Sequence, residues 1–237
     1  MDFYLKKIFL IKFMLYIVPT PIGNLEDFTF RALRILKEVD VILVENFKNS
    51  KKLLNFYNIN TIVKKYHIYN EHKKVPFIIN EIKKGKKYAL ISSAGTPSIS
   101  DPGFLLIRSC IKNFISVECL PGSTALIPAI VNSGFSINEF VFIGFLPKKK
   151  KLIKLKNISK EHRTIILYES PYRLLKTLEE IKILFGPKRN IVLCKEMTKI
   201  FQKILRGNVE NILLHYKNSS EKILGEYTIV IEKNFKN

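Results

Sequence analysis

The sequence lacks the glycine patterns that mark the commonest nucleotide-binding folds. Its 237 residues contain no G-x-G-x-x-G and no G-x-x-x-x-G-K-[ST]. The common dinucleotide fingerprint, the usual methyltransferase glycine loop and the P-loop are therefore excluded. Ser98 and Ser100 are not set in a G-x-S-x-G turn, so the nucleophile elbow of α/β-hydrolases is excluded as well.

Cysteine, long apolar runs and clustered metal ligands are also scarce. An odd, dispersed set of three cysteines favours buried free thiols in a reducing cytoplasm; they are Cys110, Cys119 and Cys194. The four histidines are scattered, and no Cys/His spacing indicates a metal site. No apolar run reaches the roughly 18 residues that span a bilayer. Residues 3–13 carry three lysines and no small-residue cleavage site, which argues against a secretory signal. We expect a cytoplasmic protein without membrane segment or metal.

Acidic residues are scarce relative to basic ones. The chain has 20 Asp and Glu against 40 Lys and Arg, which gives a formal net charge of +20. Basic side chains release condensed counterions from phosphates, so this charge favours a nucleic-acid partner. The alternative is AT-rich codon drift, since most of the basic residues are Lys, and Ile and Asn are abundant too.

Continuous apolar strands alternate with helices in the first part of the chain. Strands are predicted at 15–18, 41–44, 87–91 and 117–120, and helices at 28–38, 51–57, 76–84, 104–111 and 123–132. Asp27, Ser50 and Ser123 are predicted to cap three of these helices. The alternation predicts a mostly parallel sheet covered on both faces.

A proline and four consecutive lysines at 147–151 predict a linker between two lobes. We expect an N-terminal extension at 1–13, an N-terminal α/β lobe at 14–146 and a C-terminal α/β lobe at 152–237. Strands at 164–168, 190–194, 201–206 and 225–232, with helices at 172–184 and 209–215, predict a smaller mixed sheet in the second lobe.

Three loops rich in Pro, Gly, Ser and Thr follow strands of the first lobe, at 19–25, 92–103 and 120–125. Open α/β sheets hold ligands at the carboxyl ends of their strands, so the three loops are expected to share one rim. Asp101 is predicted as a helix N-cap and Pro102 as the first helical residue. The alternative for each loop is an ordinary connection.

The second lobe contributes two motifs at strand ends. In Y-E-S-P-Y-R-L-L, at 168–175, the strand delivers Glu169 to a loop in which Ser170 caps a helix and Arg173 lies in its first turn. The alternative is that Glu169 only completes the helix start. In K-E-M-T-K, at 195–199, opposite charges follow a strand, and the alternative there is a solvated turn.

Together these segments resemble one family. The matching segments are LYIVPTPIGNLED at 15–27, SAGTPSISDPG at 93–103, PGSTA at 121–125, GFLPKK at 144–149, YESPYRL at 168–174 and KEMTK at 195–199, with Arg206-Gly207 and Gly225-Glu226. In order and spacing they are similar to the ribosomal RNA small subunit methyltransferase I family of the tetrapyrrole methylase superfamily, over roughly residues 15–232.

The resemblance implies two tetrapyrrole methylase-like α/β lobes with a cofactor cleft between them, and a homodimer. It implies an enzyme that uses S-adenosylmethionine to methylate the ribose 2′-oxygen of a cytidine in the decoding centre of 16S rRNA in the small ribosomal subunit. It further implies that the cofactor is bound by Pro21, Gly23, Gly95, Thr96, Pro97, Ser98, Asp101, Ser123, Thr124, Ala125 and Tyr168.

The chain departs from the family pattern after its second strand. The family usually carries an acidic pair followed by Thr-Arg, whereas this chain reads Glu45-Asn46-Phe47-Lys48. One carboxylate is lost and lysine replaces arginine, which weakens a bidentate or charge-pair role there. Two milder departures are Ser123-Thr124 in place of Pro-Ser, and Tyr172 where histidine is common.

Methyl transfer to a ribose hydroxyl needs a group that accepts the hydroxyl proton. The candidates are Glu169, Lys195 and Asp101. The candidate RNA phosphate contacts are Lys148, Lys149, Lys150, Lys151 and Arg173. Two other functions stay open: methylation of a tetrapyrrole or other small metabolite on the same fold, and non-catalytic RNA binding in ribosome assembly.

Overall fold

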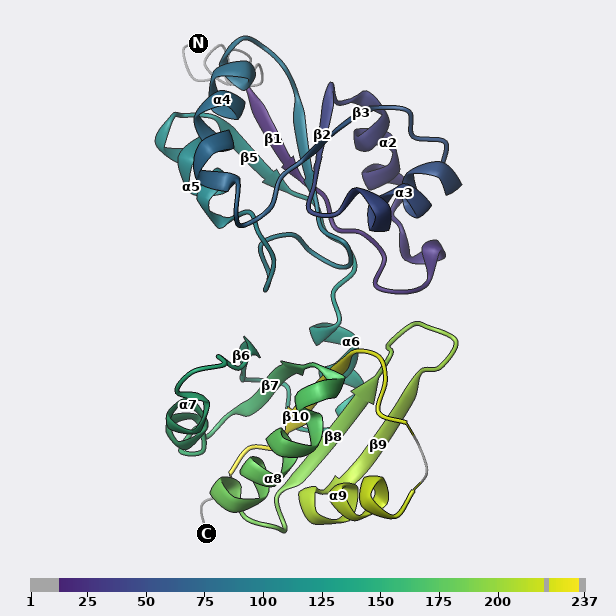
Figure 1. Cartoon of the computed structure of the whole chain (residues 1–237), viewed down its shortest axis with the longest axis vertical. Coiled ribbons are helices and arrows are strands. Elements are labelled where there is room, and N and C mark those ends of the chain that lie inside the picture. Colours follow the sequence, from purple (N-terminus) through teal and green to yellow (C-terminus); the bar gives the residue numbers. More distant parts are fainter. Residues whose placement is uncertain (1–12, 220–221, 235–237) are drawn as a thin grey trace. The chain divides into compact units, whose positions relative to one another are not determined.

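The computed structural model describes residues 13–219 and 222–234, so the expected extension lies, except for Phe13, outside the described residues. The chain forms two compact units, Met1–Thr124 and Ala125–Asn237. Each unit is a β-sheet packed with helices (Figure 1). The predicted fold class, two α/β lobes with a parallel and a mixed sheet, is confirmed.

The first unit contains a five-stranded sheet in the order β3-β2-β4-β1-β5. Its strands are β1 (Met14–Ile17), β2 (Val41–Val44), β3 (Ile62–Lys65), β4 (Tyr88–Ile91) and β5 (Ser116–Cys119). Every pair in it is parallel. All five carboxyl ends therefore lie at one edge, where α/β sheets bind ligands.

Helices cover both faces of this sheet, as the uninterrupted apolar strands predict. Helices α2 (Phe30–Glu38) and α3 (Phe47–Phe56) lie on one side, and α4 (Glu71–Lys83) and α5 (Phe104–Lys112) on the other (Figure 1). Alternate residues of each strand serve opposite faces, because successive side chains point to opposite sides. In β4, Leu90 packs in the core with α4 and α5, whereas Ile91 packs with α2 and α3.

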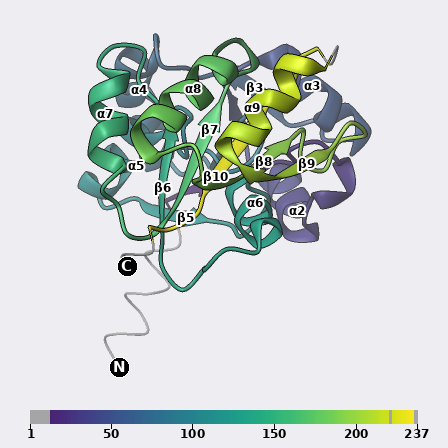
Figure 2. The same ribbon diagram turned by 90° about the horizontal axis from the view of Figure 1, so that it is seen from below.

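The second unit contains a mixed sheet in the order β6-β7-β10-β8-β9. Its strands are β6 (Phe140–Phe145), β7 (Thr164–Glu169), β8 (Asn190–Lys195), β9 (Lys203–Asn208) and β10 (Tyr227–Ile231). Only the β6–β7 pair is parallel. Helices α7 (Lys151–Ile158), α8 (Leu174–Phe185) and α9 (Val209–Asn218) build the core on one face (Figure 2).

The division between the units lies earlier than the lysine run that was predicted as the linker. Helix α6 (Leu126–Ser133) packs on β10 and β8, and β6 joins the second sheet. Residues 125–146 therefore belong to the second unit rather than to the lobe predicted at 14–146. The end of the lysine run is structured as well, since Lys151 is buried and begins α7.

Four predicted helix caps are wrong: Asp27, Ser50, Asp101 and Ser123. Thr29, rather than Asp27, caps α2 by accepting the Ala32 N–H, and Asn46, rather than Ser50, caps α3. For α2, composition alone does not choose between two neighbouring residues that can both cap. Helix α3 begins four residues earlier than predicted, so Ser50 lies inside it. Helix α5 starts after Gly103 with no side-chain cap, so Asp101 is not its N-cap.

Within the described residues, none of the helices combines the length and apolarity that a membrane crossing requires. The cysteines are free: Cys110 and Cys194 are buried as expected, but Cys119 is exposed. Burial raises the pKa of the Cys110 thiol to about 12 and that of Cys194 to about 11.

Candidate functional site

The predicted rim of the first sheet is a set of loops fastened to one another. Thr20 and Gly95 exchange two backbone hydrogen bonds of 2.9 Å, which join the loop after β1 to the loop after β4. The Thr20 hydroxyl donates to the Ser92 carbonyl at 3.2 Å, and the Ser92 hydroxyl donates to the Gly95 carbonyl at 2.8 Å. The two loops therefore have a fixed relative position.

The third loop is fastened to the same group. Thr96 donates its hydroxyl to the Ser123 carbonyl at 3.1 Å, and the Ser123 hydroxyl donates to the Asp27 carbonyl at 2.9 Å. Ser123 therefore bridges loops and does not cap α6, whose N-cap position is Ala125. Gly122 lies so close to Pro19 that an added Cβ would be 2.6 Å from the proline Cβ.

The loop after β4 holds non-glycine residues in the left-handed region of backbone space. Ser98 has φ 72° and Ser100 has φ 65°. Each such residue costs about 1–2 kcal/mol, and strain of this kind gathers at ligand sites. An observed outlier of this sort motivates a hypothesis of binding at Gly95–Gly103.

Not all of the predicted cofactor residues lie on this rim. Pro21, Gly23, Gly95–Ser98, Asp101, Ser123 and Thr124 belong to the first unit. Ala125 and Tyr168 belong to the second unit. There the Tyr168 ring contacts the rings of Phe142 and Phe145, with centroids 4.9 and 5.6 Å away.

A hollow of about 410 Å³ opens at the same carboxyl edge of the first sheet. It is lined by residues that follow β2, β3 and β4: Glu45, Asn46, Asn49, His67, Ile68, Tyr69 and Ser93. Sequence reasoning missed most of them, although the departure at Glu45–Lys48 marked the segment. In the described part of the chain, the buried Nδ1 of His67 has no hydrogen-bond partner. Such an atom is costly, but because it is buried it does not itself face the hollow. The side chains of Glu45, Asn46, Asn49 and Ser93 make the lining polar, so this hollow suits a polar ligand.

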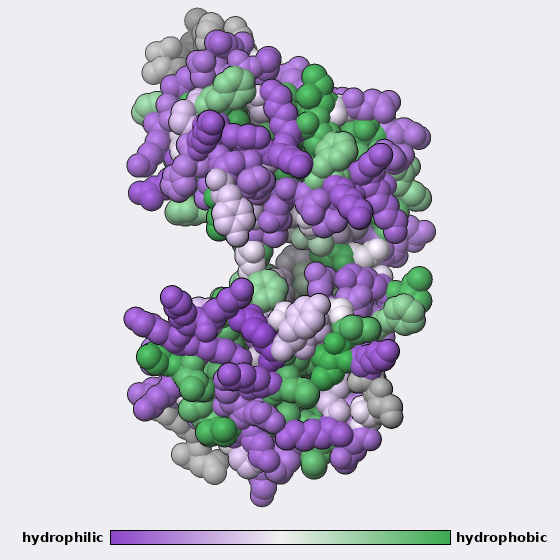
Figure 3. Space-filling model, viewed as in Figure 1, coloured by the Kyte–Doolittle hydropathy of each residue, from purple (hydrophilic) through white to green (hydrophobic). Residues whose placement is uncertain are grey.

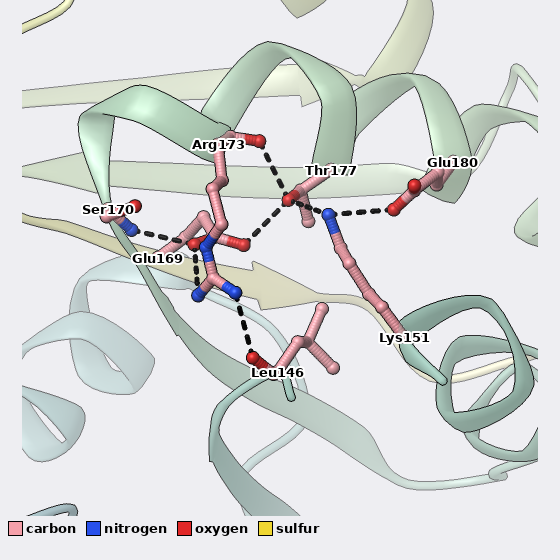
Figure 4. Close-up of polar contacts among 7 residues, drawn as sticks. All are labelled: Leu146, Lys151, Glu169, Ser170, Arg173, Thr177 and Glu180. Atoms are coloured by element: carbon pink, nitrogen blue, oxygen red, sulfur yellow. Dashed lines mark hydrogen bonds and ion pairs between the residues drawn. The ribbon is translucent and has the colours of Figure 1, made fainter. Parts of the chain in front are cut away.

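In the second unit, Glu169 is enclosed by partners (Figure 4). Its side chain is fully buried. One carboxylate oxygen pairs with Arg173 at 2.8 Å and accepts the Ser170 N–H at 2.8 Å. The other accepts the Thr177 hydroxyl at 2.6 Å. With both oxygens engaged, this carboxylate has the surroundings of a positioning group.

The K-E-M-T-K motif and the Gly225-Glu226 pair meet in a second charged network. Glu196 pairs with Lys199 at 2.8 Å and accepts the Glu226 N–H at 2.8 Å. Lys199 also pairs with Glu226 at 2.9 Å. Burial raises the pKa of Glu196, but the hydrogen bonds from Lys199 and the Glu226 amide outweigh it, and the pKa lies below its usual range. The motif is therefore a structured junction rather than a solvated turn, and Lys195 is half-buried beside it.

The predicted RNA contacts divide into two groups. Lys148, Lys149 and Lys150 are exposed, whereas Lys151 is buried and pairs with Glu180 at 2.8 Å. Arg173 donates to the Leu146 carbonyl at 2.9 Å. Hydrophilic side chains gather over α7 and the segment before it (Figure 3).

Comparison with known proteins defines the class. The sequence model of the Tetrapyrrole (Corrin/Porphyrin) Methylases matches residues 14–213. The structure of a uroporphyrin-III C-methyl transferase from Thermus thermophilus, complexed with S-adenyl homocysteine, resembles this chain with a TM-score of 0.64. That comparison covers 92% of this chain and 96% of the other at 15% sequence identity. The family model places the chain in the tetrapyrrole methylase family, and the structural likeness shows the same fold.

Closer relatives place it within that class. It is 44% identical over 230 residues to the ribosomal RNA small subunit methyltransferase I of Buchnera aphidicola, covering 94% of this chain and 80% of the relative. It is 44% identical over 218 residues to the protein of the same name from Thermotoga maritima, covering 92% and 97%. The chain belongs to the ribosomal RNA small subunit methyltransferase I family.

Proposed function

We propose that the chain uses S-adenosylmethionine to methylate the ribose 2′-oxygen of a cytidine in the decoding centre of 16S rRNA. The observation that carries this proposal is the 44% identity, across nearly the whole chain, to relatives named for methylation of small-subunit ribosomal RNA. The choice of cytidine and of the 2′-oxygen follows the family resemblance of the motifs.

The rim loops of the first unit suit the cofactor. S-adenosylmethionine presents a ribose diol, an amino-acid group and an adenine edge, which need hydroxyls and backbone polar groups at fixed positions. The segment 95–103 supplies hydroxyls from Thr96, Ser98 and Ser100, and its attachment to Thr20 and Ser123 holds it in one conformation. A preorganised site of this kind loses less conformational entropy on binding.

The cofactor supplies a methyl group on a positively charged sulfur, and the protein must align the acceptor and remove its proton. Glu169 is poorly placed for this task, because its side chain is fully buried and both of its oxygens are engaged. We therefore propose Lys195 or Asp101 as the group that takes the proton of the 2′-hydroxyl. The bond from that oxygen to the methyl carbon forms as the sulfur–methyl bond breaks.

The test is methyl transfer to small ribosomal subunits from a strain that lacks this modification. Purified protein and S-adenosylmethionine with a tritiated methyl group are incubated with the subunits, and the RNA is digested to nucleosides. We expect the label in 2′-O-methylcytidine at one decoding-centre position. Lys195→Met and Asp101→Asn are compared with Lys188→Met, an exposed lysine of the second unit outside both networks.

Label in another nucleoside, or in added porphyrinogen instead of RNA, would overturn the assignment. Absence of S-adenosylmethionine binding in calorimetry, with RNA affinity retained, would favour a ribosome-assembly role without catalysis. Parallel reactions with naked 16S rRNA decide whether the assembled subunit is needed.

A further inference from the structure

The second unit contains a basic hollow of about 570 Å³ beside α7 and α8. Five cationic side chains line it: Lys148, Lys150, Lys151, Arg173 and Lys176. A single carboxylate, Glu180, lines it as well, together with the apolar side chains of Leu152 and Ile153. The excess of positive charge favours an anionic ligand.

Buried acids neutralise only the two cations that form part of its frame (Figure 4). Lys151 pairs with Glu180 at 2.8 Å, and both side chains are about 10% exposed. Arg173 pairs with the buried Glu169 at 2.8 Å. Thr177 connects the two pairs, since its hydroxyl accepts from Lys151 and donates to Glu169, both at 2.6 Å.

The other three cations are left uncompensated. Lys148, Lys150 and Lys176 are exposed, and none of them forms an ion pair with another described residue. Lys150 is held at φ 60°, in the left-handed region, where it enters α7. The hollow therefore has a rigid, internally neutral frame and about three positive charges free for a ligand.

The apolar part of the hollow narrows the choice of ligand. Leu152 and Ile153 are 56% and 59% exposed, although they begin a helix whose other apolar residues, Leu155 and Ile158, are buried. A small anion would leave these side chains in water. A nucleic-acid strand offers phosphates to the lysines and, between the phosphates, the faces of sugars and bases.

We propose that this hollow binds the sugar–phosphate backbone of the RNA substrate, and that Glu169 is a positioning residue that holds Arg173 and, through Thr177, Lys151 in its frame. The proposal rests on the proposed function in taking the substrate to be RNA. It assigns Lys176 to RNA binding and assigns Lys151 to the frame.

The first experiment measures the binding of a fluorescein-labelled single-stranded RNA by anisotropy over a range of salt concentrations, without cofactor. The triple variant Lys148→Gln/Lys150→Gln/Lys176→Gln is compared with a control triple of equal charge change. The control is Lys160→Gln/Lys188→Gln/Lys222→Gln, whose three lysines are exposed and lie outside the hollow.

We expect the hollow triple to bind RNA at least roughly tenfold more weakly than the wild type at low salt. The slope of log affinity against log salt concentration should fall in magnitude by about 2, because each of the three lost phosphate contacts accounts for about 0.7. The control triple should stay near the wild type. Equal losses in both triples would mean a general charge effect and would overturn the proposal. Displacement of the RNA by polyglutamate of equal charge, at equal affinity, would do the same by indicating an acidic protein as the ligand.

The second experiment separates positioning from chemistry. Glu169→Gln keeps the side-chain size but removes the charge that holds Arg173. We expect a higher KM for RNA with kcat and S-adenosylmethionine affinity unchanged, a similar effect for Thr177→Val, and recovery in Thr177→Ser, which keeps the hydroxyl. A loss of kcat at saturating RNA would show that Glu169 acts in the reaction.

The outcomes distinguish this proposal from the proposed function. If wild-type protein transfers no methyl group to ribosomal RNA while the hollow triple alone loses RNA binding, the proposed function is refuted and the proposed RNA site in the hollow is supported. If transfer occurs but the hollow triple binds RNA like the wild type, only the proposal that the hollow binds RNA is refuted. The lysine variants are on the surface, so the test holds even if a buried variant does not fold.

Discussion

Gly225 is expected to be costly to replace, for two separable reasons. Its φ of +89° is unfavourable for any residue with a Cβ, which costs about 1–2 kcal/mol. A Cβ at this position would also lie 2.5–2.7 Å from three side-chain atoms of Glu196. The Glu196 carboxylate must then leave the network with Lys199 and the Glu226 amide, a partly screened set of charged hydrogen bonds that contributes about 2 kcal/mol. Gly225→Ala should therefore lower the free energy of unfolding of the second unit by about 3–4 kcal/mol.

Gly134→Ala provides a matched control in the same unit. Gly134 has φ +72°, in the left-handed region, but an added Cβ would meet nothing within 4 Å. This substitution carries the conformational cost alone, about 1–2 kcal/mol. The assay is urea unfolding followed by circular dichroism, with hydrogen exchange of the β10 amides reporting on the second unit. The difference between the two variants, about 2 kcal/mol, measures the Glu196 network.

This difference should depend on pH. Because the folded pKa of Glu196 lies below its ordinary value of 4.5, the network contributes fully above that value and is lost as pH falls through the folded pKa. The gap between the two alanine variants should therefore narrow in acid. Equal costs at neutral pH, or a gap that does not change in acid, would refute the assignment of this energy to the Glu196 carboxylate.

Two further predictions concern the first unit. A thiol reagent such as DTNB should modify one cysteine of the native protein, the exposed Cys119, and all three after denaturation; Cys119→Ser should abolish the native reaction. Gly122→Ala should force the Pro19 ring away from a Cβ contact of 2.6 Å. Overpacking of this kind costs about 1–3 kcal/mol of stability. Because the contact is relieved by displacing the rim loop that holds Pro19, we expect S-adenosylmethionine affinity in calorimetry to fall roughly tenfold, a loss of about 1.4 kcal/mol. Gly85→Ala, in the same unit and with nothing within 4 Å of an added Cβ, should leave the affinity unchanged.

The two-lobe α/β architecture could be predicted from the sequence, because an uninterrupted run of apolar residues indicates a strand that is buried on both faces. The strand predicted at 41–44 is observed at Val41–Val44, and that predicted at 164–168 at Thr164–Glu169. Strand β3 was missed, because Ile62–Lys65 is an edge strand whose side chains are exposed or half-buried. The unit boundary was misplaced for a related reason: proline and lysine indicate a break in local structure, whereas the sheet that β6 joins depends on distant pairing.

The part of the candidate site that consists of loops could be predicted from the sequence. The part that depends on which charged side chains pair with one another could be predicted less well. The three rim loops were expected to converge, and their hydrogen bonds join them. Glu169 and Arg173 are four residues apart, so their pairing was open to sequence reasoning. The pairing of Lys151 with Glu180 was not, because these residues are distant in the sequence and meet only through tertiary structure. The unpartnered Nδ1 of His67 could not be predicted either, because a histidine without other ligands or catalytic residues at a characteristic spacing gives no signal in the sequence.

The placement of carboxylates separates the two explanations of the net charge of +20. Codon drift towards lysine explains a large number of lysines. It does not explain which of them form ion pairs with carboxylates and which do not. In the hollow of the second unit, the two least exposed cations, Lys151 and Arg173, each have a buried carboxylate, as the cost of isolated charge away from water requires. The three exposed lysines around them have none among the described residues. Because such lysines repel one another, a rigid frame that gathers them beside exposed apolar side chains is destabilising for the free protein and favourable once a polyanion binds. The arrangement therefore supports RNA binding more strongly than the composition does.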